Sequence, residues 1–168
     1  MIYLNKVIEK WKSKRVVMEG CIVSEINEIE VNIAKEKLPL CYIEFLENTG
    51  KWMTDNPTNP NYYDYGSFVG NAVFYYNDLK LNNNEEGLIG LLQEDESPLT
   101  LPEKAFVFYG HQGYIYAFFK LNEGDNPPVY GYEEGYEGAS FPKIADSLSS
   151  FYERYIDGDK TLFAELRE

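Results

Sequence analysis

Two aromatic runs separated by a short glycine-bounded segment constrain the fold of this chain more than any other feature. Residues 105–109 and 114–119 are rich in Phe, Tyr, Val and Ile, which favour strands. The four residues between them begin with Gly110 and end with Gly113, as is typical of a hairpin turn. A third run of this kind, residues 129–132, follows two prolines. Because consecutive strands with short connections pair antiparallel, we expect a central antiparallel sheet.

Amphipathic stripes lie at both ends of the chain, outside the strand-rich region. Apolar residues at positions i, i+3, i+4 and i+7 predict helices that pack by one face. The N-terminal stripe is Leu4, Val7, Ile8 and Trp11, and the C-terminal stripe is Leu148, Phe151, Tyr152 and Tyr155. Leu162, Phe163 and Leu166 are expected to form one more turn that docks the tail. This order predicts the α+β class, with a central antiparallel β-sheet flanked by N-terminal helices and a C-terminal helix.

Two further helices are expected between residues 24 and 50. Ser24 is suited to cap the first helix, because its hydroxyl accepts a backbone N–H that has no partner in the first turn. The second begins at Leu38–Pro39, since proline is tolerated in a first turn, and Gly50 is suited to end it. The buried residues are expected to be Ile26, Ile29 and Ile33 in the first helix and Tyr42, Phe45 and Leu46 in the second.

Residues 51–76 combine a polar, proline-containing segment with a strand pattern. Residues 51–67 contain two prolines and several asparagines, which disfavour a regular element, yet they also carry Trp52 and three tyrosines. We expect a partly ordered insertion there. Residues 69–76 are β-branched and aromatic, and they predict a strand that ends at Asn77 and Asp78.

The length of the chain and its apolar pattern indicate how many domains it forms and where in the cell we expect it. A chain of 168 residues fits a single domain, here spanning 1–168. Charged residues, beginning with Lys6 and Glu9, interrupt the N-terminus before the apolar core of a secretory signal is reached, and no run approaches the roughly 18 residues of a membrane span. We therefore expect a cytoplasmic protein. Cys21 and Cys41 have no metal-ligand spacing and are expected to be buried, reduced thiols.

The charge is strongly negative and unevenly distributed. The net charge is −13, and because residues 1–15 carry five bases against one acid, the remaining 153 residues carry −17. Such a surface repels phosphate backbones, so no nucleic-acid binding is expected, and it attracts a partner with a basic surface. The alternative is that the acidity serves only to keep the protein in solution.

The motifs of catalysis and of cofactor binding are missing from the sequence. His111 is the one histidine, and neither a G-x-S-x-G elbow nor a glycine-rich phosphate loop occurs. We therefore expect no catalytic, cofactor-binding or metal-ligating residues and no enzymatic activity. A glycan-processing enzyme with two carboxylates is the less favoured alternative, because 28 acids place some suitable pair in many folds.

Several short segments, taken in their order and spacing, point to a known family. They are residues 24–30, Leu38–Pro39, residues 42–46, Gly50, Leu101–Pro102, residues 106–108, 113–118, 127–130 and 144–151. This order resembles the SUKH superfamily, which includes fungal cell-wall-assembly regulators and many bacterial toxin-immunity proteins. The resemblance covers about residues 24–156. It implies an antiparallel sheet flanked by helices and an immunity protein that binds and neutralises a cognate toxin domain, for example a nuclease. A regulatory scaffold in cell-wall or envelope assembly is the alternative.

Two segments have the mixture of tyrosines and acids expected of a partner surface. The candidate partner-binding residues are Tyr62, Tyr63, Asp64 and Tyr65 in one segment, and Tyr132, Glu133, Glu134, Tyr136 and Glu137 in the other. The alternative is that the first segment is simply packed and the second is a solvated acidic loop. The sequence leaves the identity of the toxin and the oligomeric state open.

Overall fold

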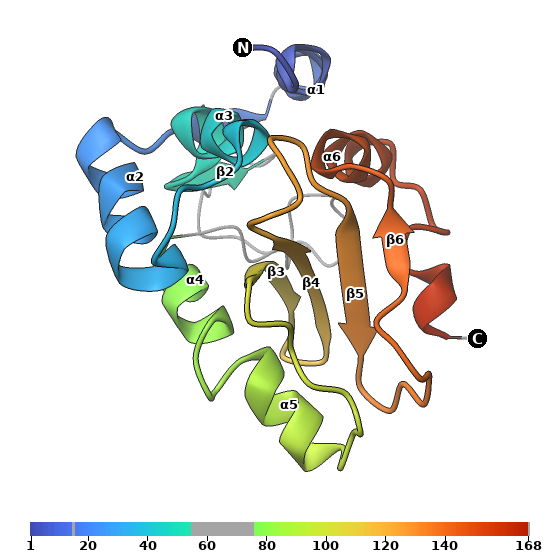
Figure 1. The fold of residues 1–168 in the computed structure, drawn as a ribbon. Coiled ribbons are helices and arrows are strands. Elements are labelled where there is room, and N and C mark those ends of the chain that lie inside the picture. The colour runs from blue at the N-terminus through green and yellow to red at the C-terminus, as the bar shows by residue number, and fades with distance from the viewer. Residues whose placement is uncertain (15, 55–75, 168) are drawn as a thin grey trace.

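The computed structural model describes residues 1–14, 16–54 and 76–167, and its centre is a four-stranded antiparallel sheet with the order β3-β4-β5-β6 (Figure 1). The strands are β3 (Ala105–His111), β4 (Ile115–Lys120), β5 (Val129–Glu133) and β6 (Lys143–Ala145). Six helices accompany the sheet in the described residues. The expected α+β class with a central antiparallel sheet is confirmed, as are the three strands predicted from the aromatic runs.

The hairpin between β3 and β4 turns more tightly than the glycine spacing suggests. Gln112 and Gly113 both have left-handed backbones, with φ of 52° and 81°, and Tyr114 N donates to His111 O at 3.1 Å. Two consecutive left-handed residues at the centre of a turn match the right-handed twist of the flanking strands. Gly110 and His111 therefore belong to β3, where His111 pairs with Ile115.

Side chains of the strands alternate between two apolar faces, except at the irregularity in β3 where Phe108 and Tyr109 both belong to the main core. Phe106, Phe108 and Phe119 point into the main core, whereas the neighbouring Val107 and Phe118 point into a second, smaller core on the opposite face. Side chains alternate between faces along a strand, so a run of uninterrupted apolar residues buries both faces. The sheet is therefore covered on both sides.

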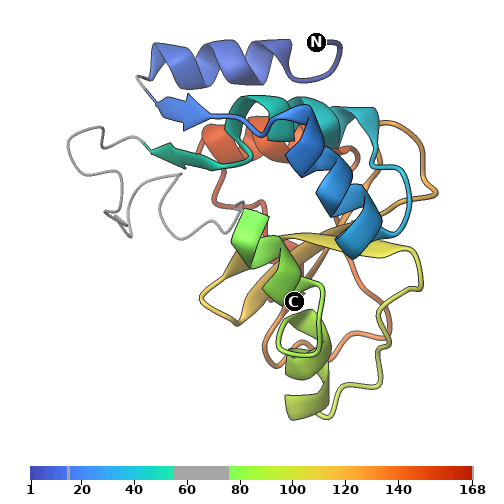
Figure 2. The same ribbon diagram turned by 90° about the vertical axis from the view of Figure 1, so that its left-hand side faces the viewer.

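The main core lies under α1 (Asn5–Ser13), α3 (Leu40–Thr49) and α6 (Leu148–Ile156). Figure 2 shows α1 outermost, above α3 and α6, with the sheet beneath them. Phe45 and Tyr152 stack at 4.6 Å between ring centroids, and Trp11 meets both rings edge-on at 6.2 and 6.3 Å. All three rings are fully buried, which confirms the predicted stripes of these helices.

The start of α2 (Val23–Ile29) differs from the prediction. The physical role of Gly50, which follows α3, also differs from the predicted one. Ser24 is not the N-cap, because Ile22 occupies that position and its backbone N–H donates to Glu25 Oε2 at 2.8 Å. Gly50 does end α3, but its φ is −63°, so no left-handed backbone is needed there. Glycine is required there for space, since a Cβ would lie 2.6 Å from Cys21 Sγ.

Two smaller elements lie near these helices. A π-helical turn (Glu30–Ala34) extends α2, and β1 (Val17–Glu19) pairs with β2 (Trp52–Thr54).

The prediction of a strand at residues 69–76 is wrong at the C-terminal end of that range. Residues 69–75 lie outside the described residues, but Tyr76 to Asn82 form helix α4, so Asn77 and Asp78 end no strand. The side chain of Asn83 explains the arrangement. It donates to Leu79 O at 2.9 Å and to Val107 O at 2.8 Å, and it accepts from Val107 N at 2.9 Å. Asn83 thus ends α4 and also satisfies the edge of β3.

Two elements that sequence patterns did not assign complete the fold. The apolar run that begins at Gly87 forms α5 (Leu88–Glu94), which covers the second core. The second such element is strand β6, which is only three residues long.

The turn after α6 is a 3₁₀ helix, Ala164–Leu166. Leu166 packs against Gly131 of β5, where a Cβ on residue 131 would lie 3.1 Å from Leu166 Cδ2. The predicted docking of the tail is therefore confirmed.

Both cysteines are free and buried, as predicted. Burial raises the pKa of the Cys21 thiol to about 11, with the negative charge of Glu25 adding to the effect. Burial likewise raises the pKa of Cys41. Within the described residues, we find no helix that combines the length and the apolar character needed to cross a membrane.

Candidate functional site

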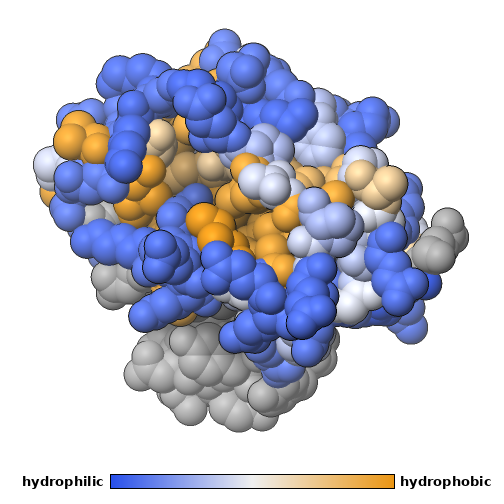
Figure 3. All heavy atoms as spheres, turned by 60° about the horizontal axis from the view of Figure 1, so that its bottom comes forward, coloured by the Kyte–Doolittle hydropathy of each residue, from blue (hydrophilic) through white to orange (hydrophobic). Residues whose placement is uncertain are grey.

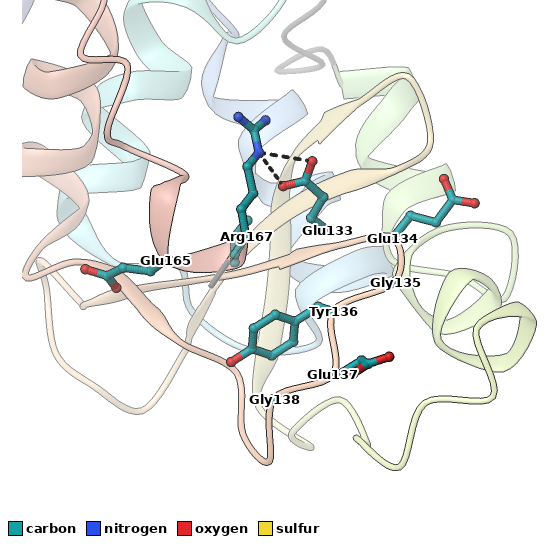
Figure 4. A pocket seen from close by; sticks show the side chains of 9 residues that line it. Glu133, Glu134, Gly135, Tyr136, Glu137, Gly138, Glu165 and Arg167 are labelled. Carbon is teal, nitrogen blue, oxygen red and sulfur yellow. Dashed lines mark hydrogen bonds and ion pairs between the residues drawn. The ribbon is translucent and has the colours of Figure 1, made fainter.

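The segment that follows β5 and the C-terminal segment enclose a groove of about 670 Å³ (Figure 4). One wall is the loop of residues 133–138, and the other is residues 165–167. We call this cavity the acidic groove. The docking of Leu166 against β5 holds the two walls side by side, although they are about 30 residues apart in the sequence.

Backbone geometry fixes the course of the loop wall. Gly135 has a φ of 78°, a left-handed conformation that disfavours any side chain, and Tyr136 N donates to Glu133 O at 3.0 Å to close the turn. Tyr136 OH donates to Ser140 O at 3.1 Å. A Cβ at Gly138 would lie 2.0 Å from Tyr136 OH, so glycine leaves the room that the ring occupies.

Asp95, the C-cap of α5, anchors the loop from below. Its Oδ2 accepts from Tyr132 OH at 2.7 Å and from Gly135 N at 2.9 Å. Tyr132 is fully buried, and its ring meets that of Tyr136 edge-on at 6.1 Å. Burial, followed by the hydrogen bond to Asp95, raises the pKa of Tyr132 to about 12. The loop is therefore held by the second core and by the end of α5.

An ion pair and a small network position the opposite wall. Arg167 Nε lies 3.0 Å from Glu133 Oε2, so this pair closes the groove at one end (Figure 4). Further back, Asp159 accepts from Thr161 and from Arg154 Nε, the latter at 2.7 Å. Arg154 also donates to Ile144 O at 2.6 Å. These contacts join α6, β6 and the C-terminal segment.

The electrostatics of the acidic groove are dominated by carboxylates. The side chains of Glu134 and Glu137 extend from the loop wall on the side away from the C-terminal wall, and Glu165 extends from the C-terminal wall (Figure 4); all three are exposed. Among the described residues, the carboxylates of Glu134 and Glu137 accept no hydrogen bond and form no ion pair. Within the part of the chain that the structure describes, Glu133 is the one glutamate of the lining that forms an ion pair with a base, and the four glutamates and one arginine of the lining sum to a net charge of −3. Its borders attract cationic groups.

The structure brings together four of the candidate residues chosen from the sequence. Glu133, Glu134, Tyr136 and Glu137 line one groove. Tyr132 belongs to the same loop, but its buried ring supports the groove from beneath, and we do not include it in the contact surface. The other candidates, Tyr62, Tyr63, Asp64 and Tyr65, lie outside the described residues.

Sequence reasoning missed the contributions of Asp95, Glu165 and Arg167. Asp95 was visible only as part of an acidic run, and nothing local shows that it reaches a loop 40 residues away. Glu165 and Arg167 belong to a short tail whose role depends on where it docks.

Two buried carboxylates outside the groove, Glu30 and Glu44, have structural roles. Within the described residues, no group of three or more His, Cys, Asp or Glu side chains is placed to hold a metal ion. The two carboxylates that are buried there, Glu30 and Glu44, accept hydrogen bonds from backbone N–H groups.

Comparison with known proteins assigns the family. The model of the SMI1/KNR4 family (SUKH-1) matches residues 20–154, most of the chain. The chain belongs to this family. The SUKH-1 match runs from the residue after β1 into α6, which agrees with the resemblance inferred from the short segments. It includes the loop wall of the acidic groove and stops before the C-terminal wall. Comparisons with curated proteins and with solved structures gave no match.

Proposed function

We propose that this SUKH-1 protein is a cytoplasmic, non-catalytic immunity protein that binds and neutralises a cognate toxin domain through the acidic groove. The SUKH superfamily, which the chain resembles, includes many bacterial toxin-immunity proteins. The observation that carries the proposal is the gathering of four glutamates and Tyr136 from two chain segments around one cavity. A toxin with a basic surface, such as a nuclease cleft, has the complementary charge.

Charge and packing give the groove two distinct roles in such a complex. The exposed carboxylates of Glu134, Glu137 and Glu165 draw a cationic surface toward the groove and speed association, most strongly at low salt. Tyr136 supplies a partly exposed ring that is already held by its hydroxyl bond, so binding costs little side-chain freedom. A basic cleft covered in this way is closed to its substrate.

Coexpression tests the proposal directly. The chain is expressed together with the toxin domain encoded beside its gene, and survival of the cells is measured. Wild type is expected to protect, and the double variant Glu134→Gln, Glu137→Gln to protect less. A matched control, Glu85→Gln with Glu86→Gln, removes two exposed acids elsewhere on the surface and is expected to protect fully. If no toxin gene lies nearby, or both double variants protect equally, the proposal loses its support.

Regulation of cell-wall or envelope assembly is the second candidate, because the same family includes fungal regulators of that process. It is favoured if the chain copurifies with envelope or signalling proteins and its gene lies away from toxin genes. Tyr62, Tyr63, Asp64 and Tyr65 are proposed as a further contact in either case. Replacing the three tyrosines with Ala tests that proposal in the same survival assay.

A further inference from the structure

A second, apolar pocket lies outside the acidic groove. It has a volume of about 430 Å³ and is formed by α5 and the segment 96–101. Its aliphatic lining consists of Ile89, Leu92, Leu99 and Leu101. Figure 3 views the molecule from the side on which α5 lies, and it shows apolar residues gathered in a hollow with hydrophilic residues along its edge.

The aliphatic groups of this pocket are not all needed to build the core. Leu88 and Leu91 of α5 pack in the second core, whereas Ile89 is half-buried and lines the pocket instead. Burying aliphatic surface of this kind stabilises a complex by about 25 cal/mol per Å². The chemistry of the lining therefore selects a large apolar side chain.

The rim of the pocket is acidic. Glu96 lines it and Glu94 is exposed at the end of α5, while the lining includes no base. Asp95 stands between these two residues and bonds Gly135, a lining residue of the acidic groove. This hydrogen bond joins the acidic end of α5, which borders the pocket, to the loop wall of the acidic groove.

We infer that this pocket receives a large apolar side chain, such as Leu or Phe, from a cationic segment of the partner whose basic residues lie along the acidic groove. The inference rests on the proposed function and names the chemistry that the partner needs: lysines or arginines flanking one apolar anchor. Charge complementarity selects the segment, and the anchor fixes its position. Buried anchors in pockets supply most of the affinity in many protein interfaces.

Two synthetic peptides of equal charge test the inference. One combines lysines with leucines, and the other has every leucine replaced by serine; binding of each to the full chain is measured by calorimetry. Wild type is expected to bind the leucine peptide at least about tenfold more tightly than the serine peptide, as burial of one leucine predicts. The variant Ile89→Ser is expected to lose most of that preference. Val23→Ser, which removes an exposed apolar side chain that does not line the pocket, is the matched control and is expected to keep that preference.

The outcomes separate this inference from the proposed function. Equal affinity for the two peptides, or an unchanged preference in Ile89→Ser, overturns the apolar anchor. Protection against a toxin in the survival assay can still be retained in that case. Conversely, a clear leucine preference lost only in Ile89→Ser supports the pocket even if no toxin is neutralised. Because Ile89 is not part of either core, its variant is expected to fold, which thermal unfolding checks.

Discussion

The carboxylate of Asp95 accepts a hydrogen bond from the hydroxyl of Tyr132 at 2.7 Å and thereby ties the end of α5 to the base of the acidic groove. The same oxygen accepts from Gly135 N at 2.9 Å, so one carboxylate holds both a buried ring and the turn above it. Asp95 is therefore the residue through which α5, the second core and the groove depend on one another.

Replacing Asp95 with Ala is expected to destabilise the protein and to loosen the loop wall. The change leaves the hydroxyl of buried Tyr132 and the amide of Gly135 without their acceptor, which costs about 1–3 kcal/mol in the free energy of unfolding. Urea unfolding measures the loss, and hydrogen exchange at Gly135 reports the loop. The control Glu94→Ala removes an exposed neighbouring acid and is expected to change stability by less than about 0.5 kcal/mol. Equal effects of the two variants would show that Asp95 has no special role.

Glu44 is expected to hold the N-terminal segment on the main core. It is buried in α3, and its Oε2 accepts from Tyr3 N and Leu4 N, each at 2.9 Å, at the start of α1. Glu44→Ala removes the acceptor of these amides and is expected to cost about 1–3 kcal/mol. Limited proteolysis near the N-terminus checks whether the segment is released. Glu47→Ala, an exposed site on the same helix, is the control, and similar proteolysis of both variants would contradict this role.

The ionised carboxylate of Asp159 stabilises the folded protein, and this contribution to the free energy of unfolding is lost in acid. Hydrogen bonds from the Thr161 hydroxyl, then from Arg154 and from Thr161 N, lower the pKa of its carboxyl from 3.8 to about 2. Between these two values the unfolded chain binds a proton that the folded chain does not, so the contribution is present above pH 3.8 and falls as the pH drops toward 2.

The variant Asp159→Asn is therefore expected to be less stable than wild type at neutral pH, with the difference shrinking as the pH falls through that window. Thr161→Ala removes one donor and is expected to lie between the two. Chemical unfolding at a series of pH values measures these differences. A gap between wild type and Asp159→Asn that is constant from pH 5 to pH 2 would be the contrary result.

The two cysteines are expected to resist thiol reagents while the protein is folded. Both are buried, and burial raises the pKa of each thiol, which lowers the fraction of reactive thiolate at neutral pH. Alkylation followed by mass measurement is expected to label neither in the native protein and both in denaturant. Rapid native labelling of Cys21 or Cys41 would be incompatible with the packing described.

Local patterns predicted the elements whose residues carry their own signal. The stripe ending in Trp11 and the hairpin around Gly113 follow from spacing and composition alone. The two failures differ in kind. Ser24 is not the cap because Glu25 accepts from Ile22 N, a local contact that competes with the serine cap, whereas the end of α4 is fixed by the distant bond of Asn83 to β3. A three-residue strand such as β6 is defined by its pairing with β5, which no local pattern contains.

In the candidate site too, some residues could be recognised from the local sequence and others could not. The loop wall was recognisable from its tyrosines and glutamates, since composition is local. The opposite wall was not, because the position of Arg167 depends on the docking of Leu166 against β5. Asp95 was equally hidden, since its partners lie about 40 residues away.

The affinity of the chain for the toxin domain encoded beside its gene, measured by calorimetry at low and at moderate salt, tests the central claim most directly. Wild type is expected to bind more tightly at low salt, and Glu134→Gln with Glu137→Gln to bind at least about tenfold more weakly and with less dependence on salt. The control pair Glu85→Gln and Glu86→Gln is expected to match wild type. An affinity and a salt dependence that both stay unchanged in the groove variant would contradict the account.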